Sequence, residues 1–492
     1  MSLKNIDIYF KTDLKSKMMK YKSIKAIHMV LGAFIFLSFV SCVKTLEDIK
    51  PNIIFIMVDD LGKEWISCYG SESITTPNID KLAETGMQFN NAYSMAQCTP
   101  TRTSLLTGQY PFNTGWINHW DVPRWGVGYF DWEKYTTFAS LMQSAGYRTA
   151  AAGKWQINDF RIEPEAMKKH GFDDWCMWTG GEGTNPPSHK RYYDAYINTH
   201  EGSKTYTDEF GPDVFTDFII DFMKKNKDNP MMIYYPMVLT HLPLTTTPDE
   251  PNVEGMEEAF PAMVRYTDKI VGKLVGAIDD LGIRDHTVII FTTDNGSPRK
   301  ATGIRIGVPT PGAKAKTTEP GLCQPFIVNC PGRVPEGVKS NALTAFVDMF
   351  PTFAELGGAK LPTGTKLDGK SIAKVMLGQD TEGPHQWICG MGHGAARLTP
   401  EGVAPVQEFT HRSIRDKQFK VFIDDNREIV ELYNLEADPL EENNLIDEKE
   451  SYKKEMDKFQ AILDAMPQKD AWPKYRPRAA NPWDMEVKVK SR

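Results

Sequence analysis

Acidic and amide side chains follow two of the most apolar runs in the chain. Asp59 and Asp60 come directly after NIIFIMV, and Asp294 and Asn295 come directly after TVIIFTT. All four are hard oxygen donors, which suit Ca²⁺ or Mg²⁺ rather than Zn²⁺. Carboxylates that converge without a cation would also repel one another strongly. We therefore expect these four residues to bind a metal. We favour Ca²⁺ because its flexible shell accepts mixed carboxylate and amide ligands.

A lysine and a histidine follow two further apolar runs. Residues 147–152 lead into Lys154, and residues 231–239 lead into His241. Each of them alone is also typical of a solvated loop, just as a single Asp after a strand is often a helix cap. In open α/β sheets, however, ligands gather beyond the carboxyl ends of the strands. Four strand ends bearing Asp-Asp, Lys, His and Asp-Asn therefore predict one convergent site.

A cysteine opens the segment 98–108, which reads CTPTRTSLLTG. Pro100 suits the first turn of a helix, so we expect Cys98 at a helix N-terminus, where free N–H groups favour an anion. Arg102 lies one turn further along and faces the same way. These residues predict a reactive cysteine or a cradle for an oxyanion, and a buried structural cysteine is the alternative.

The elements that position these residues alternate between β-type runs and helical stretches. The runs 52–58 and 287–293 are continuous β-type runs, as in strands buried on both faces of a parallel sheet. Helical stretches are expected at 78–86, 138–144 and 263–281. The predicted fold class is therefore α/β, with a large mixed, mostly parallel sheet sandwiched by helices.

A smaller α+β domain is expected near the C-terminus. The composition shifts near residue 383, residues 408–422 and 428–433 read as strands, and residues 449–466 carry apolar residues at helical spacing. Residues 467–492 are rich in Pro, Trp and basic groups and form an arm that either borders the substrate pocket or wraps the surface. The predicted boundaries are a catalytic domain at 50–382, a smaller domain at 383–466 and the arm at 467–492.

The overall composition excludes several classes of protein. The 492 residues are 25% charged and 41% hydrophobic, which excludes a disordered chain, a collagen-like repeat, a coiled coil and a small disulfide scaffold. The formal net charge of −7 argues against nucleic acid as a partner. The seven cysteines show no metal-binding spacing such as CxxC, and their scatter assigns no disulfide pairing.

Residues 1–41 are expected to be a signal peptide, with Met18 or Met19 as alternative translation starts. Three lysines precede a short apolar run that ends at Cys42. The run LSFVSC resembles a bacterial lipobox, in which the cysteine is lipidated, although Phe39 stands where that motif usually has Leu. Ordinary cleavage nearby is the alternative. We expect an exported bacterial protein, in the periplasm or as an outer-membrane lipoprotein anchored to the membrane through Cys42.

Five segments of the chain together resemble the type I, formylglycine-dependent sulfatases of the alkaline-phosphatase superfamily. CxPxR followed by LLTG matches the sulfatase signature at Cys98, and the segments DD and TTDNG match the two metal segments. GAKAKTTEPG at 312–321 is similar to the family's lysine segment, and LYNLEADPLEENNL at 432–445 is similar to its C-terminal signature. The segments occur in family order over most of the chain. The resemblance implies an alkaline-phosphatase-like fold.

The resemblance also implies a reaction at Cys98. A maturase would oxidise Cys98 to formylglycine, which is an aldehyde hydrate that also binds the metal. One hydroxyl then attacks sulfur and displaces the alcohol, and the other collapses to the aldehyde and expels sulfate. This route combines nucleophilic catalysis with charge clamping of the sulfuryl oxygens.

The resemblance assigns roles to four cations around the nucleophile. Arg102 would hold and polarise formylglycine, and Lys154, in the family's GKWH element, would contact a sulfuryl oxygen. His241, in the H-x-P element, would bind sulfate or protonate the leaving oxygen. Lys314 would clamp sulfate near the leaving group, with Lys316 as the alternative.

Two segments depart from the family pattern. Gln156 stands where GKWH has its His, and Gln forms hydrogen bonds but does not titrate near neutrality. Base-assisted release of sulfate therefore needs another group. Residues 319–325 read EPGLCQP in place of EGGxRxP, so the arginine of that motif is absent, and its role is either lost or supplied elsewhere.

Substrate specificity is expected from loops over the site. Weak candidates, able to stack on sugar rings, to pair with carboxylates or to form hydrogen bonds, are Gln156, His119, Trp120, Arg124, Trp178 and His189. Packing of these side chains under loops is the alternative. We expect a sulfuric ester hydrolase acting on a sulfated carbohydrate. The alternatives are a phosphate or phosphonate ester hydrolase on the same scaffold, or a sulfated-glycan-binding lipoprotein that has lost catalysis.

The Gln156 departure gives a first testable prediction. Gln156→His would restore a titrating group, so the rate of sulfate release is expected to be unchanged or faster. General-base effects span about 10²–10⁴-fold. A loss of more than about 100-fold in a sulfate-release assay would show instead that glutamine is specifically required.

Overall fold

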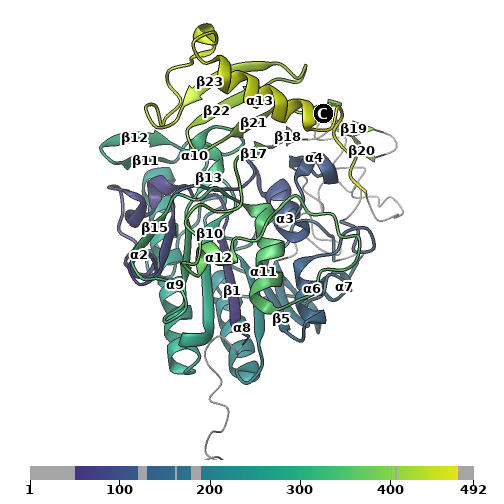
Figure 1. Ribbon diagram of the computed structural model, residues 1–492. Coiled ribbons are helices and arrows are strands. Elements are labelled where there is room, and N and C mark those ends of the chain that lie inside the picture. Colours follow the sequence, from purple (N-terminus) through teal and green to yellow (C-terminus); the bar gives the residue numbers. More distant parts are fainter. Residues whose placement is uncertain are drawn as a thin grey trace, which may run out of the picture. The chain divides into compact units, whose positions relative to one another are not determined.

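The computed structural model describes residues 50–119, 130–160, 163–178, 190–395, 397–399, 402–404 and 407–474. Within these residues the largest sheet has ten strands, and helices pack on both of its faces (Figure 1). In spatial order, the strands are β15 (Val338–Ser340), β2 (Met87–Phe89), β14 (Phe326–Asn329), β10 (Thr287–Thr293), β1 (Asn52–Val58), β9 (Met231–Pro236), β5 (Arg148–Lys154), β6 (Asp174–Trp178), β7 (Tyr196–Thr199) and β8 (Gly202–Thr205).

The centre of this sheet is parallel and entirely buried. Ile54 of β1 lies opposite Ile289 of β10 on one side and Ile233 of β9 on the other, and both pairings are parallel. Strand β5 continues the parallel set beside β9. Every residue of β1, β9 and β10 is buried, as expected for strands covered on both faces. The carboxyl ends of these strands therefore open at one edge of the sheet.

Two layers of helices cover the sheet and divide its apolar side chains into two cores. Phe55 packs with Phe138 and Phe353 from one layer, whereas Ile54 shares the other core with Phe260. The first layer contains α3 (Cys98–Thr107), α6 (Phe138–Ser144) and α11 (Met349–Gly357), and the second contains α2 (Pro77–Glu84), α8 (Gly211–Asn226) and α9 (Gly255–Asp280). The predicted sandwich of a mixed sheet between helices is confirmed.

A second, antiparallel sheet follows toward the C-terminus. Its four strands are β17 (Ile388–Met391), β21 (Arg412–Arg415), β22 (Phe419–Ile423) and β23 (Ile429–Asn434). Helix α13 (Lys453–Ala465) packs on this sheet through Phe459 and Leu463, and the same core includes Tyr93 of the catalytic part. The expected small α+β unit is thus present, and its exact boundaries stay a prediction.

The structure shifts several predicted elements. β5 runs to Lys154, because Gly153 adopts a φ of +112° and lies so close to β9 that a Cβ would meet the Pro236 carbonyl oxygen at 2.0 Å. The predicted strand 408–422 is two strands, because the Asp416 carboxylate accepts backbone N–H groups of Gln418 and Phe419 and turns the chain. Helix α9 begins at Gly255, eight residues before the predicted start, with Pro261 inside it.

Neither a membrane span nor a disulfide is found in the described residues. None of their helices combines the length and apolarity needed to cross a bilayer. The six described cysteines are free thiols, and four of the five apart from Cys98 are buried. The predicted signal peptide and Cys42 lie outside the described residues.

Candidate active site

Four loops meet at the carboxyl edge of the parallel strands. Asp59 and Asp60 follow β1, and Asp294 follows β10 beside it. Single ligand atoms of these three carboxylates lie within 4.8 Å of one another, and all three residues are buried. Single ligand atoms of Asp59, Cys98 and His241 form a second such group. The predicted convergence of strand ends is therefore present as one cluster.

Backbone contacts fix the carboxylates in place. The Asp59 N–H donates to the Leu239 carbonyl at 2.8 Å, which ties the end of β1 to the loop after β9. Asp60 adopts a φ of +64°, and its N–H donates to Oδ1 of Asp294 at 3.0 Å. The Asn295 amide donates to Oδ1 of Asp60 at 2.7 Å. The left-handed turn at Asp60 lets two consecutive aspartates face the same cluster.

Three cations neutralise this cluster. Lys154 Nζ lies 2.6 Å from Oδ2 of Asp59, and Lys314 Nζ lies 2.5 Å from Oδ2 of Asp60. Arg102 Nη2 lies 3.2 Å from Oδ2 of Asp294. The side chains of Arg102 and Lys154 are at most 2% exposed, so these pairs are shielded from solvent. Of the two lysines considered for this place, Lys314 is the one that pairs with a carboxylate of the cluster.

Helix α3 presents its first turn to the cluster. Cys98 is its first residue and is fully buried, and Thr101 Oγ1 donates to the Asp294 carbonyl at 2.8 Å. Arg102 Nη1 donates to the Lys154 carbonyl at 2.6 Å, which links α3 to the end of β5. The predicted position of Cys98 at a helix N-terminus, with Arg102 on the same face, is thus what the structure shows.

The environment of the cluster shifts the pKa values of two of its carboxylates in opposite directions. Burial would raise the pKa of Asp59, but the charges of Lys154, His241 and Arg102 outweigh it and hold the pKa below its ordinary value. Burial and the neighbouring charge of Asp59 raise the pKa of Asp294 well above its ordinary value. A cation between these side chains would oppose that second effect.

The donor set fits a hard metal ion. Oδ1 of Asp59 and Oδ1 of Asn295 are buried and accept no hydrogen bond from any described residue, whereas Oδ2 of Asp59 faces the ammonium group of Lys154. Together with Asp60 and Asp294 they offer oxygens alone, which suits Ca²⁺ or Mg²⁺. The residues predicted as metal ligands therefore fit the group that the cluster was expected to bind.

His241 brings an arginine into the site that the sequence did not indicate. Nδ1 of His241 lies 3.1 Å from Nη1 of Arg191, and Nε2 lies 3.7 Å from Oδ2 of Asp60. The Arg191 guanidinium also stacks 4.1 Å from the centroid of the Trp178 ring. Burial, followed by the charges of Lys154 and Lys314, lowers the pKa of His241 well below its ordinary value. Arg191 belongs to none of the motifs found in the sequence, so its place beside His241 becomes visible only in the fold.

The remaining predicted substrate residues are placed only in part. Gln156 is half-buried, with a φ of +75° just after β5, and Trp178 ends the neighbouring β6. His119 ends β4 (Asn118–His119), and only the backbone of His119 is described. The predicted residues that lie outside the described ranges are Trp120, Arg124 and His189.

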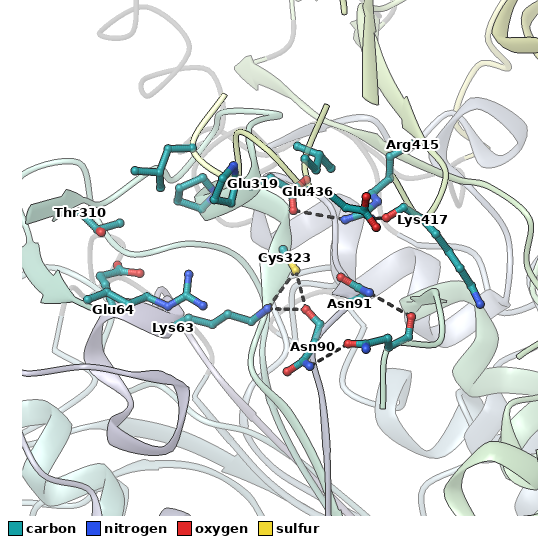
Figure 2. Close-up of a pocket in the computed structure, with 16 residues that line it drawn as sticks. Lys63, Glu64, Asn90, Asn91, Thr310, Glu319, Cys323, Arg415, Lys417 and Glu436 are labelled. Atoms are coloured by element: carbon teal, nitrogen blue, oxygen red, sulfur yellow. Dashed lines mark hydrogen bonds and ion pairs between the residues drawn. The ribbon is translucent and has the colours of Figure 1, made fainter. Parts of the chain in front are cut away.

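A lysine stands near the position of the missing family arginine. Cys323 occupies that arginine's place in EPGLCQP, and Lys63 Nζ lies 2.9 Å from its Sγ while donating to the Asn90 carbonyl at 2.8 Å (Figure 2). Lys63 follows the predicted metal ligands Asp59 and Asp60 in sequence. A positive charge is thus present beside Cys323, supplied from a different segment.

Comparison with known proteins identifies the family. The sulfatase family model matches residues 51–359, and the C-terminal model of N-sulphoglucosamine sulphohydrolase matches residues 314–469. The N-acetylgalactosamine-6-sulfatase of Canis lupus familiaris is 30% identical over 67% of this chain and 66% of its own length. The ulvan-active sulfatase of Formosa agariphila is 27% identical over 91% of this chain and 86% of its own length.

Solved structures agree with this match. The crystal structure of Ps i-CgsB is 27% identical, with a TM-score of 0.71, and the match covers 86% of this chain and 95% of that one. Its complex with k-i-k-neocarrahexaose gives a TM-score of 0.69 over 90% of this chain and 98% of that one, at 25% identity. On the family model, which spans more than half of the sequence, and on these likenesses, the chain belongs to the sulfatase family of enzymes.

Proposed function

We propose that this chain hydrolyses sulfate esters of carbohydrates and releases inorganic sulfate, with Cys98 converted to formylglycine. The observation that carries the proposal is the position of Cys98. It is the first residue of α3, buried, and grouped with Asp59 and His241. A side chain at this point meets free N–H groups of the helix and a cluster of cations, which is where a sulfuryl group would be held.

The proposed reaction is nucleophilic displacement at sulfur. One hydroxyl oxygen of the hydrated formylglycine attacks sulfur, and the S–O bond to the substrate alcohol breaks with its electron pair going to the alcohol oxygen. His241 supplies the proton to that oxygen or holds the sulfuryl group. The attacking hydroxyl and then the second hydroxyl give up their protons to water. The aldehyde re-forms as the C–O bond to sulfate breaks with its electron pair leaving on sulfate, and addition of one water restores the hydrate.

The cations of the cluster hold charge during both steps. Lys154 and Lys314 carry ammonium groups that face the carboxylates in this structure, and the sulfuryl oxygens would share them. Burial opposes the charge on Lys314, yet the neighbouring Asp60 raises the pKa of its ammonium group, so the clamp stays positive. Arg102, fixed on the Lys154 carbonyl, orients residue 98 from the same helix turn.

We assign the metal site to Ca²⁺, with Asp59, Asp60, Asp294 and Asn295 as the protein ligands. When bound, the ion would act as a Lewis acid at the nucleophile and at the sulfuryl oxygens. The buried Oδ1 atoms of Asp59 and Asn295, which accept no hydrogen bond from any described residue, support this assignment.

The substrate class is supported by the relatives. The ulvan-active sulfatase and the structure bound to k-i-k-neocarrahexaose point to carbohydrate ligands for similar chains. The Arg191–Trp178 pair beside His241 offers a cation and an aromatic face, which suit an anionic sugar. Export through residues 1–41, a lipid anchor at Cys42 and a maturase for Cys98 complete the proposal.

A matched pair of substrates tests the reaction class. 4-Nitrophenyl sulfate is expected to be hydrolysed faster than 4-nitrophenyl phosphate, and Cys98→Ala is expected to lower sulfate release by at least about 10³-fold because the nucleophile is lost. Cys68→Ala, at a partly exposed thiol, is the control and should leave the rate unchanged. Faster phosphate hydrolysis would favour a phosphoesterase, and sulfate release that survives Cys98→Ala would contradict the proposed nucleophile.

Metal binding can be measured without catalysis. For chelator-treated protein, Ca²⁺ at 100 times its Kd is expected to raise the free energy of unfolding by about 2.7 kcal/mol. Asp294→Asn should abolish most of that gain in a thermal melt, whereas Asp228→Asn, on the exposed surface, should retain it. A gain equal in both variants, or none in the unaltered chain, would contradict the assignment.

A further inference from the structure

A second pocket lies at the far end of the helix that begins at Cys98. Its volume is about 540 Å³, and Thr107, the last residue of α3, contributes to its lining. At 1.5 Å per residue, Thr107 lies about 14 Å along the helix axis from Cys98. We call this second pocket the Trp472 pocket and define it by the lining residues Gln109, Asn113, Lys134, Lys366, Trp472 and Lys474.

The charge of the Trp472 pocket is entirely positive. Lys134, Lys366 and Lys474 are exposed, and none of them forms an ion pair with a carboxylate of the described residues. No Asp or Glu is among the described residues that line it. The pocket of Figure 2 differs, because three glutamates line it and its Arg415 pairs with Glu319 at 3.5 Å. An anion entering the Trp472 pocket would therefore meet cations that no described carboxylate neutralises.

An indole ring stands at the edge of these lysines on a fixed backbone. Trp472 is 63% exposed, although its neighbours are held by the protein. The Ala471 N–H donates to the Phe112 carbonyl at 2.8 Å, and the Lys474 N–H donates to the Tyr135 hydroxyl at 3.1 Å. A Cβ on Gly115, whose φ is +80°, would meet the Pro473 nitrogen at 2.2 Å. The segment is thus pinned on both sides of Trp472 while the indole remains open to solvent.

The two features together indicate the chemical class of a ligand. Ammonium groups attract sulfate or carboxylate, and a rigid, exposed indole packs against the apolar face of a sugar ring. The Gln109 amide adds a hydrogen-bonding group for hydroxyls, whereas the Asn113 amide nitrogen already donates to the Asp368 carboxylate at 2.9 Å. A flat apolar ligand would leave the three lysines without a partner, and a small free anion would make no contact with the indole.

We propose that the Trp472 pocket is a second glycan-binding site, which holds an anionic stretch of polysaccharide outside the reaction centre. The choice of a saccharide among polyanions rests on the proposed function. The site would keep a long chain on the protein between successive cleavages, because the second binding event is then intramolecular. It also gives a role to the first residues of the C-terminal arm.

Binding to dextran sulfate, with unmodified dextran as its neutral counterpart, tests the proposal. The full chain is expected to bind dextran sulfate alone. Trp472→Ala is expected to raise the Kd about tenfold, and so is the triple change Lys134→Gln, Lys366→Gln and Lys474→Gln. Trp472→Phe should keep most of the affinity. The matched control changes exposed lysines elsewhere to glutamine, namely Lys225, Lys227 and Lys454, and should alter the Kd by less than about twofold.

Four other outcomes would overturn the proposal. If the control triple weakened dextran sulfate binding as much as the pocket triple, the binding would be due to the overall charge of the protein. If the Kd of Trp472→Ala were unchanged, the indole would not contribute to binding. Binding of the same residues to phosphatidylglycerol vesicles without binding to dextran sulfate would indicate a membrane surface. The rate of 4-nitrophenyl sulfate hydrolysis should be equal in all variants. A loss of this rate together with the loss of dextran sulfate binding would show that the pocket is part of the reaction centre. If neither the unaltered chain nor any variant hydrolysed 4-nitrophenyl sulfate, the proposed function would be contradicted, and the binding measurements would still test this pocket.

Discussion

The site depends on balancing buried charges that repel one another. Asp59, Asp60 and Asp294 lie together where no solvent screens them, and burial alone would drive their protons back on. Lys154 and Lys314 each contact one of these carboxylates, and Arg102 contacts a third. Because removal of any one partner leaves an unpaired buried charge, the cluster ties the positions of all its members together.

The fold supplies that balance by bringing distant segments to one edge. Parallel strands deliver the aspartates and Lys154 from the sheet, and α3 delivers Arg102. The C-terminal sheet supports the lysine segment, because Lys420 is buried between Glu319 and Glu441 at 3.0 Å and 2.6 Å. Glu319 lies five residues after Lys314, so the small sheet braces the segment that clamps the cluster. The described part of the C-terminal sheet therefore contributes to the site by supporting the segment that carries Lys314.

Residues at the ends of strongly apolar strands were predictable from the sequence, and others were not. β1 and β10 run as predicted over 52–58 and 287–293, because a strand buried on both faces leaves an unbroken apolar run. Arg191 was missed, since its contact with His241 arises between a loop and a strand end and leaves no periodic signal. Lys63 was missed for a similar reason, because a charge beside Cys323 is supplied from a segment 260 residues away.

The central claim is that residue 98 is the nucleophile in oxidised form, and the mass of the tryptic peptide that contains it tests this claim most directly. For protein made in its native host, the account predicts a loss of about 18 Da, the change from thiol to aldehyde, confined to residue 98. The other five described cysteines serve as internal standards, since their thiols should keep their full mass. An unmodified thiol at Cys98 from a host with a working maturase would contradict the account.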